Sequence, residues 1–194
     1  MDLRMSLEEK NLFRLQLDSS TNYLEFGMGG STIAAIERGL PVVSVESDRQ
    51  WISNVEDTIG EKFPEKKAHF KPIFIDIGPT REWGIPCSKE KQHLWPNYFM
   101  SVWAQLDEKP DFVLIDGRFR TACFFSCLFA LPSTTKIAIH DFRDGYEVRK
   151  NYEKSLEFAD IDSAAGTLFV LRKKPQFDHL KALAAFHSVM NDYW

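Results

Sequence analysis

The feature that most constrains the fold of this chain is a regular alternation between short β-rich runs and segments with helical periodicity. Five runs rich in β-branched and aromatic residues lie at 23–26, 41–47, 69–78, 111–117 and 136–142. Such alternation produces right-handed βαβ units, so the strands lie parallel and helices cover both faces of the sheet. We therefore predict one α/β domain over residues 1–194, with its ligands beyond the carboxyl ends of the strands.

Two segments depart from this rhythm. Residues 79–97 contain three prolines and two tryptophans and predict a long loop, which either closes over a ligand or packs against the edge of the sheet. Near the end of the chain, LEFADID and TLFVLRK flank SAAG without a helix between them. That arrangement predicts a hairpin whose last strand runs antiparallel to the others, and the final residues, HLKALAAFHSVMNDYW, predict an amphipathic helix.

Composition narrows the class of function. The chain is 44% hydrophobic with a net charge of −4, which is typical of a folded protein without the basic stripe of a nucleic-acid binder. The sequence has neither a signal-peptide core nor a long apolar run, so we expect a cytoplasmic protein with a small-molecule partner and no membrane or nucleic acid. Of the three cysteines, Cys123 and Cys127 lie in an apolar helical run and are expected to be small buried hydrophobes rather than metal ligands.

Acidic residues stand at the carboxyl ends of all five β-rich runs. They are Glu25, Glu46, Asp76, Asp116 and Asp141. Because parallel strands end at one edge of a sheet, this pattern predicts a ligand site at that edge.

The first strand leads into a glycine-rich turn, NYLEFGMGGST. Gly27 and Gly29 permit positive φ angles and close approach of a ligand to the backbone, and Ser31 or Thr32 can cap the following helix. Glu46, at the end of the next strand, can accept hydrogen bonds from both hydroxyls of a ribose. A glycine turn with a solvated glutamate is the purely structural alternative.

The turn is not a dinucleotide fingerprint, because the sixth residue from Gly27 is Thr32 rather than glycine. Glu25 stands just before the glycines, where its charge would repel a pyrophosphate and attract a cationic ligand. S-adenosyl-L-methionine carries an ammonium, a sulfonium and a ribose but no phosphate. The electrostatics therefore favour S-adenosyl-L-methionine over NAD.

LEFGMGGST followed by VSVES resembles the first two motifs of class I S-adenosylmethionine-dependent methyltransferases. FVLIDGRFR and IAIHDF are similar to the "IDG…HD" signature of a small-molecule O-methyltransferase-like branch. The resemblance implies a Rossmann-like three-layer sandwich with a seven-stranded, mostly parallel sheet whose last strand is antiparallel. It also implies Glu25 at the cofactor's amino-acid end, Glu46 at its ribose and Asp76 at its adenine. The other expected cofactor-binding residues are Gly27, Gly29, Gly30, Ser31, Ser47 and Ile77.

Three residues are candidates for catalysis, because the fourth and fifth strands bring Asp116, His140 and Asp141 to one cleft. His140 could act as a general base, or could be hydrogen-bonded and merely hold a loop. Catechol-type relatives hold Mg²⁺ with acids at these strand ends, but Phe142 stands where their asparagine is usual, so no metal site is predicted.

Arg118 and Arg120 follow the fourth strand closely. They either bind an anionic substrate or pair with Asp144 and its neighbours.

The sequence therefore predicts a methyltransferase that uses S-adenosyl-L-methionine and acts on a small-molecule acceptor, with a hydroxyl as the expected target. A NAD-dependent oxidoreductase and a non-catalytic, methyltransferase-like binding protein are the alternatives.

Overall fold

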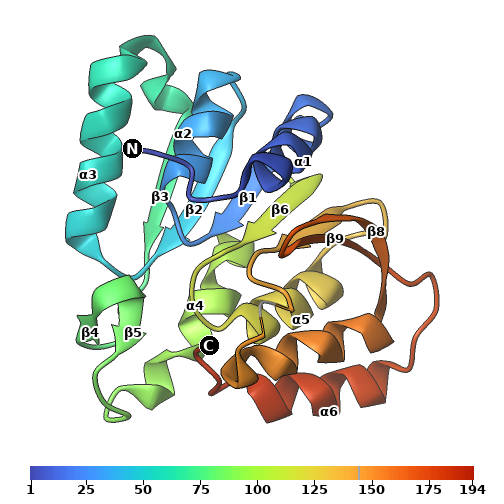
Figure 1. The fold of residues 1–194 in the computed structure, drawn as a ribbon. Helices are drawn as coiled ribbons and strands as arrows, with labels where there is room; N and C mark the ends of the chain where they lie inside the picture. The colour runs from blue at the N-terminus through green and yellow to red at the C-terminus, as the bar shows by residue number, and fades with distance from the viewer. Residues whose placement is uncertain (144) are drawn as a thin grey trace.

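A computed structural model describes residues 1–143 and 145–194. The possible pairing of Arg118 or Arg120 with Asp144 lies outside the described residues. A seven-stranded sheet runs through the middle of the molecule (Figure 1). From edge to edge its strands are β3 (Phe70–Phe74), β2 (Val42–Glu46), β1 (Tyr23–Phe26), β6 (Phe112–Ile115), β7 (Lys136–Ile139), β9 (Leu168–Lys173) and β8 (Ala159–Ala165).

The pairing of the strands confirms the predicted fold class. β1 is the central parallel strand and pairs with β2 on one side and β6 on the other, while β7 continues the parallel order next to β6. β9 pairs antiparallel with both β7 and β8, so the last strand is inserted antiparallel between them. β1, β2, β6 and β7 consequently end along one edge of the sheet.

Helices cover both faces of the sheet, as Figure 1 shows. One apolar cluster packs α1 (Leu7–Asp18), α2 (Gly30–Glu37) and α3 (Arg49–Lys62) against one face. A second, more aromatic cluster packs α4 (Pro96–Met100), α5 (Arg120–Ala130) and α6 (His179–Val189) against the other face. Among the described residues, no helix combines the length and the apolar character needed to cross a membrane.

Several elements differ from the expectation. The third strand ends at Phe74, so Asp76 and Ile77 lie in the segment beyond it. The expected loop at 79–97 contains a small hairpin of β4 (Thr80–Arg81) and β5 (Ile85–Pro86), joined by the 3₁₀ turn η2 (Glu82–Gly84), and then a second turn, η3 (Gln92–Leu94). These two-residue strands are too short to show as a periodic pattern.

Several helical segments are 3₁₀ helices. α4 continues into the 3₁₀ helix η4 (Ser101–Ala104). The helix before β8 is a 3₁₀ helix, η5 (Glu147–Glu157), and a further 3₁₀ helix, η1 (Pro64–His69), follows α3. The predicted burial of Cys123 and Cys127 in α5 is confirmed.

Candidate active site

The glycine-rich turn between β1 and α2 packs tightly against the end of β6. Gly27 has a φ of +88°, and a Cβ atom at this position would lie 2.6 Å from the Cα of Gly117. The backbone N–H of Gly29 donates a 2.8 Å hydrogen bond to Oγ1 of Thr32, which fixes the start of α2. Gly27 is therefore required both by its backbone conformation and by the close approach of β6.

Glu25 lies inside the protein rather than at the strand edge. Its side chain is fully buried beneath α2, and four hydroxyl groups donate hydrogen bonds to its carboxylate. The donors are Tyr23 (2.9 Å), Ser31 (2.7 Å), Thr32 and Ser44. Burial outweighs these bonds and raises the pKa of Glu25 to about 7.

This placement corrects the electrostatic argument made from the sequence. An enclosed carboxyl group with a pKa of about 7 is only partly ionised at neutral pH, and it does not present a fixed charge to a ligand. The alternation of side chains along β1 explains the difference. Glu25 and Tyr23 point to the same face of the sheet, the one covered by α1, α2 and α3. The buried carboxyl group of Glu25 and its hydrogen bond with Ser31 thus stabilise the turn from inside the protein.

Glu46 ends β2 beside the same turn. Its Oε1 accepts hydrogen bonds from the backbone N–H groups of Ser47 (2.6 Å) and Asp48 (3.2 Å), and its Oε2 is 3.5 Å from the backbone nitrogen of Met28. Burial raises the pKa of Glu46 despite these donors. Unlike Glu25, Glu46 is half-buried and directly contacts the backbone of the glycine turn.

The remaining residues expected at the cofactor are spread more widely. Asp76 is exposed and accepts a 2.8 Å hydrogen bond from the backbone N–H of Gly78, which stabilises the turn after β3. The side chain of Ile77 is buried in the core, and its carbonyl accepts a hydrogen bond from the indole of Trp95. Ser47 is buried under η2, where a Cβ atom on Gly84 would lie 3.5 Å from its hydroxyl.

Asp116, His140 and Asp141 do come together at the ends of β6 and β7. Nδ1 of His140 lies 3.1 Å from Oδ1 of Asp116 and 3.7 Å from Oδ1 of Asp141. The His140 side chain is buried, whereas about three-tenths of each aspartate side chain is exposed, at 31% and 27%. Asp141 also has a φ of +56°, an uncommon conformation for a residue other than glycine.

Arg120 forms a cationic bridge between the two aspartates. Its guanidinium lies 3.2 Å from Oδ1 of Asp116 and 2.9 Å from Oδ2 of Asp141, and it also donates to the carbonyls of Gly117 and His140. Three ligand atoms of the cluster lie within 4.8 Å of one another, a spacing that could hold a metal ion. Because the guanidinium of Arg120 lies between both carboxylates and Arg149 also pairs with Asp141 at 3.0 Å, these residues fit internal cations better than Mg²⁺.

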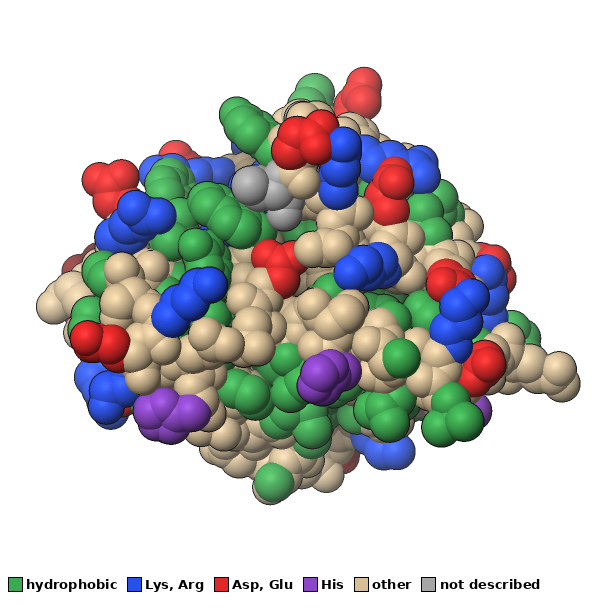
Figure 2. Space-filling model, turned by 90° about the horizontal axis from the view of Figure 1, so that it is seen from below, with side chains coloured by type: hydrophobic (Ala, Val, Ile, Leu, Met, Phe, Trp, Pro, Cys, Tyr) green, Lys and Arg blue, Asp and Glu red, His purple; other side chains and the backbone are tan. Residues whose placement is uncertain are grey.

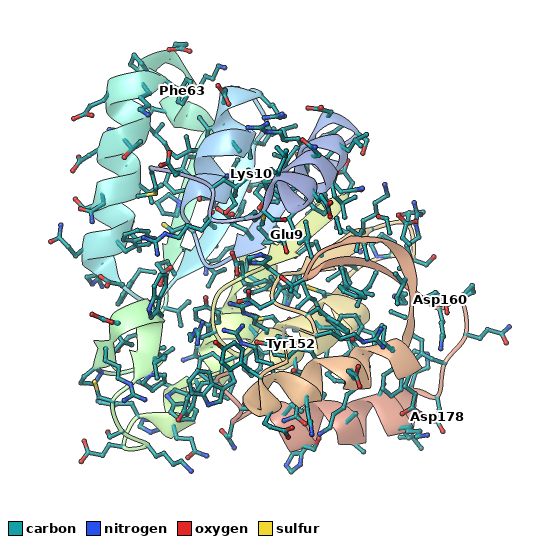
Figure 3. All side chains as sticks on the ribbon, viewed as in Figure 1. Glu9, Lys10, Phe63, Tyr152, Asp160 and Asp178 are labelled. Carbon is teal, nitrogen blue, oxygen red and sulfur yellow. The ribbon has the colours of Figure 1, made fainter. Side chains whose placement is uncertain are left out.

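Glu9 completes the surroundings of His140 and was not expected from the sequence. Its Oε2 lies 3.7 Å from Nε2 of His140, and its Oε1 accepts hydrogen bonds from the backbone and side chain of Thr167. Although burial acts to raise the pKa of Glu9, bonds from Ser6 and Thr167 and the charge of His140 lower it to about 2. Figure 3 shows Glu9 reaching from α1 toward the centre of the molecule.

The carboxyl edge of the sheet is covered by two segments. A Cβ atom on Gly30 would lie 2.4 Å from the carbonyl oxygen of Asp2, so residues 2–3 lie directly over the start of α2. The guanidinium of Arg4 lies 4.9 Å from the ring centroid of Trp83, whose φ is +65°. Residues 2–4 and η2 thus meet above the glycine turn, and we call this contact the Arg4–Trp83 clasp.

Several residues that contact the site were not predicted from the sequence. The pattern Ser6-x-x-Glu9 is a capping-box signal that indicates the start of α1, and the structure contains that box. Trp51, on α3, is 38% exposed and donates a 2.7 Å hydrogen bond to the carbonyl of Met28 in the glycine turn. No local pattern distinguishes such a tryptophan from a core residue.

The fold is similar to those of several solved protein structures. A methyltransferase-like protein from Silicibacter pomeroyi is 30% identical to this chain, with a TM-score of 0.86 over 98% of this chain and 97% of that one. An SAH-bound methyltransferase from Podospora anserina is 14% identical, with a TM-score of 0.63 over 89% and 80%. An RNA methyltransferase from Salinibacter ruber, in complex with S-adenosyl-L-homocysteine, is 12% identical, with a TM-score of 0.57 over 91% and 97%.

No protein-family model matches the chain, and no curated protein matches it. These structural neighbours are methyltransferases or methyltransferase-like proteins, and two of them bind S-adenosyl-L-homocysteine. Since the similarity to the Silicibacter pomeroyi protein combines 30% identity with nearly complete coverage of both chains, this chain belongs to the same family of methyltransferase-like proteins.

Proposed function

We propose that this chain is a methyltransferase that transfers the methyl group of S-adenosyl-L-methionine to a hydroxyl group of a small molecule. The observation that carries the proposal is the contact between Gly27 and Gly117. Gly117 directly follows Asp116, so a methyl donor bound on the glycine turn would lie beside the cluster of Asp116, His140 and Asp141. That closeness is what an in-line displacement at a sulfonium requires.

The residues at the turn support a nucleoside ligand. Glu46 contacts the turn through Met28 and retains acceptor capacity for the two ribose hydroxyls. Gly27 and Gly29 leave bare backbone at the start of α2, whose first N–H groups point toward the same edge. S-adenosyl-L-methionine is the cofactor that we propose for this site.

Within the cluster, we assign the acceptor-facing role to Asp116 and a positioning role to His140. Both ring nitrogens of His140 face carboxylates. Burial acts to lower the pKa of His140, but the hydrogen bond with Asp116 and the negative charge of Asp116 outweigh burial, so the pKa is raised. An enclosed imidazole whose two nitrogens both face carboxylates has no free nitrogen to take a proton from an acceptor. Asp116 is partly exposed and can accept a hydrogen bond from a hydroxyl, which orients an oxygen lone pair toward the methyl group. As the carbon–oxygen bond forms and the carbon–sulfur bond of the sulfonium breaks, the hydroxyl proton passes to this carboxylate.

Charge and cysteine placement support the proposed partner and compartment. Figure 2 shows lysines and arginines interspersed with aspartates and glutamates over one face of the molecule, a mixed surface that suits a small-molecule enzyme better than a nucleic-acid binder. Cys87, Cys123 and Cys127 are all free thiols, which is consistent with a reducing, cytoplasmic compartment.

The covered edge favours a second candidate, a non-catalytic binding protein with a methyltransferase-like fold. Residues 2–4 and η2 occupy the space above the glycine turn. A decayed enzyme could keep such a cover permanently, whereas an active one must open it for its substrates. The NAD-dependent alternative has no comparable observation in its favour.

Release of S-adenosyl-L-homocysteine from S-adenosyl-L-methionine, with a pool of hydroxylated small molecules as acceptors, tests the proposal. We expect product from the wild type and a loss of roughly 100-fold or more for Asp116→Asn. Asp160→Asn, an exposed site on β8, is the matched control and should keep full activity. Binding of the cofactor without any product would instead favour the non-catalytic candidate.

A further inference from the structure

Among the described residues, no carboxylate pairs with the buried guanidinium of Arg118. The side chain follows β6, is only 7% exposed, and its Nε is fully enclosed without a hydrogen-bond partner among the described residues. No carboxylate of the described chain lies within 4 Å of its guanidinium. Arg120, two residues later, is equally buried but satisfies its guanidinium with two carboxylates and three carbonyls.

The surroundings of Arg118 disfavour its positive charge. Burial, followed by the charge of Arg120 and that of Arg149, lowers the pKa of Arg118. Asp116 is close enough for its own pKa to be lowered by Arg118, but it is engaged with Arg120 and His140. The local carboxylates are therefore already paired with other cations.

Further unsatisfied donors lie in the same region. The Tyr152 hydroxyl is enclosed without a partner in the described residues and interacts electrostatically with Arg118. Tyr152 is a residue of η5, and Figure 3 labels it near the centre of the molecule. α5 begins at Arg120, two residues after Arg118, without a side-chain cap, so the positive end of its dipole adds to the positive potential at this site.

A buried guanidinium that lacks a partner costs folding free energy, and proteins ordinarily pair such charges. A ligand that supplies the missing anion removes this cost when it binds. Arg118 lies between the glycine turn and η2, where a Cβ atom on Gly84 would be 3.7 Å from its Cγ. The unpaired charge is thus located at the edge where the proposed methyl donor and acceptor meet.

We propose that Arg118, assisted by the Tyr152 hydroxyl, binds a carboxylate or phosphate group of a ligand at this edge. The inference rests on the proposed function only for the identity of that ligand. The anionic group belongs either to the amino-acid end of the methyl donor or to the acceptor. In the second case the acceptor is an acidic or phosphorylated hydroxy compound.

The first experiment uses inorganic phosphate as a probe that does not depend on methyl transfer. Thermal unfolding is followed with sodium phosphate and with sodium chloride at equal ionic strength, for wild type, Arg118→Met and Arg118→Lys. We expect phosphate to raise the Tm of the wild type and, more weakly, of Arg118→Lys. Without phosphate, Arg118→Met should have a higher Tm than the wild type, because it removes the unpaired buried charge.

Arg172→Met is the matched control, since Arg172 is 44% exposed and bonded to Asp162 at 2.6 Å, away from the site. This variant should respond to phosphate as the wild type does. If Arg118→Met fails to fold, Arg118→Lys alone carries the comparison, because lysine keeps the charge but not the bidentate geometry.

The second experiment identifies the source of the anion by calorimetric titration with S-adenosyl-L-homocysteine and with 5′-methylthioadenosine, which lacks the carboxylate. A roughly 10- to 100-fold loss for Arg118→Met that is confined to S-adenosyl-L-homocysteine assigns Arg118 to the methyl donor. Unchanged affinity for both nucleosides, with a lost phosphate response, assigns it to the acceptor. Equal phosphate responses and equal nucleoside affinities in wild type and Arg118→Met would overturn the proposal. If Arg118→Met loses the phosphate response of the wild type, but the wild type binds neither nucleoside, only the proposed function is contradicted.

Discussion

Nδ1 of His140 lies 3.1 Å from Oδ1 of Asp116, and this contact joins the ends of β6 and β7. The same attraction raises the pKa of His140 and lowers that of Asp116. Nε2 of His140 faces Glu9 on α1 at 3.7 Å, so one imidazole connects an outer helix to both strand ends. The site is therefore a set of coupled charges rather than a single free base.

The first prediction concerns that coupling. Asp116→Asn removes the main charge that favours the imidazolium, so the pKa of His140 should fall, as measured by the NMR titration of its ring protons. A raised histidine pKa stabilises the fold below the unfolded value of about 6.5 and loses this effect as pH rises through the folded value. Asp116→Asn should reduce this acid-side stabilisation, and an unchanged His140 titration would show that the contact does not control its protonation.

Glu25 gives a second prediction with its own pH window. Its pKa is raised from 4.5 to about 7 by burial, so the folded protein binds more protons than the unfolded chain between these values. The free energy of unfolding should therefore fall as pH rises from about 4.5 through 7, by roughly 3 kcal/mol from this group. Glu25→Gln should abolish that slope in urea unfolding from pH 5 to 8, and parallel profiles for the two proteins would refute the assignment.

Arg120 leads to a third prediction. Its guanidinium bridges Asp116 and Asp141, and Arg120→Met removes this shared cation, leaving Asp116 with His140 and Asp141 with Arg149, at a cost of about 3–5 kcal/mol. Mg²⁺ or Ca²⁺ should then raise the Tm of the variant while leaving that of the wild type unchanged. A metal-dependent shift in the wild type would contradict the role of Arg120 as the resident cation.

The Arg4–Trp83 clasp gives a fourth prediction. A cation–π contact at an exposed site contributes about 0.5–1 kcal/mol, so Arg4→Ala should favour the open edge by roughly two- to fivefold. Stopped-flow measurement should show a proportionally faster association of S-adenosyl-L-homocysteine with unchanged circular dichroism. Arg38→Ala, which removes a contact with Asp18 far from the turn, is the control and should leave the association rate unchanged.

The sheet was largely predictable because each of its main strands corresponds to a local run of apolar residues in the sequence. β1, β2, β6 and β7 are continuous apolar runs, and the missing crossover between β8 and β9 indicated the antiparallel insertion. α1 was overlooked although Ser6 and Glu9 form a capping box. The hairpin of β4 and β5 could not be predicted, because two-residue strands have no measurable period.

The sequence predicts which residues of the candidate site meet only where each residue stands at the end of a strand. Asp116 and Asp141 follow parallel neighbours, so their meeting follows from the topology. The orientation of Glu25 depends on side-chain alternation along β1, and the placement of Glu9 and Arg118 depends on contacts between distant segments. Long-range packing of this kind leaves no local pattern in the sequence.

The central claim, that the glycine turn and Glu46 bind S-adenosyl-L-methionine, is tested most directly by calorimetric titration with S-adenosyl-L-homocysteine. We predict stoichiometric binding to the wild type and to Glu61→Ala, an exposed control on α3. Glu46→Ala should keep its fold but lose about 100-fold or more in affinity, because two charge-assisted hydrogen bonds to the ribose disappear. Equal affinity of Glu46→Ala and the wild type, or no binding by the wild type, would contradict the claim.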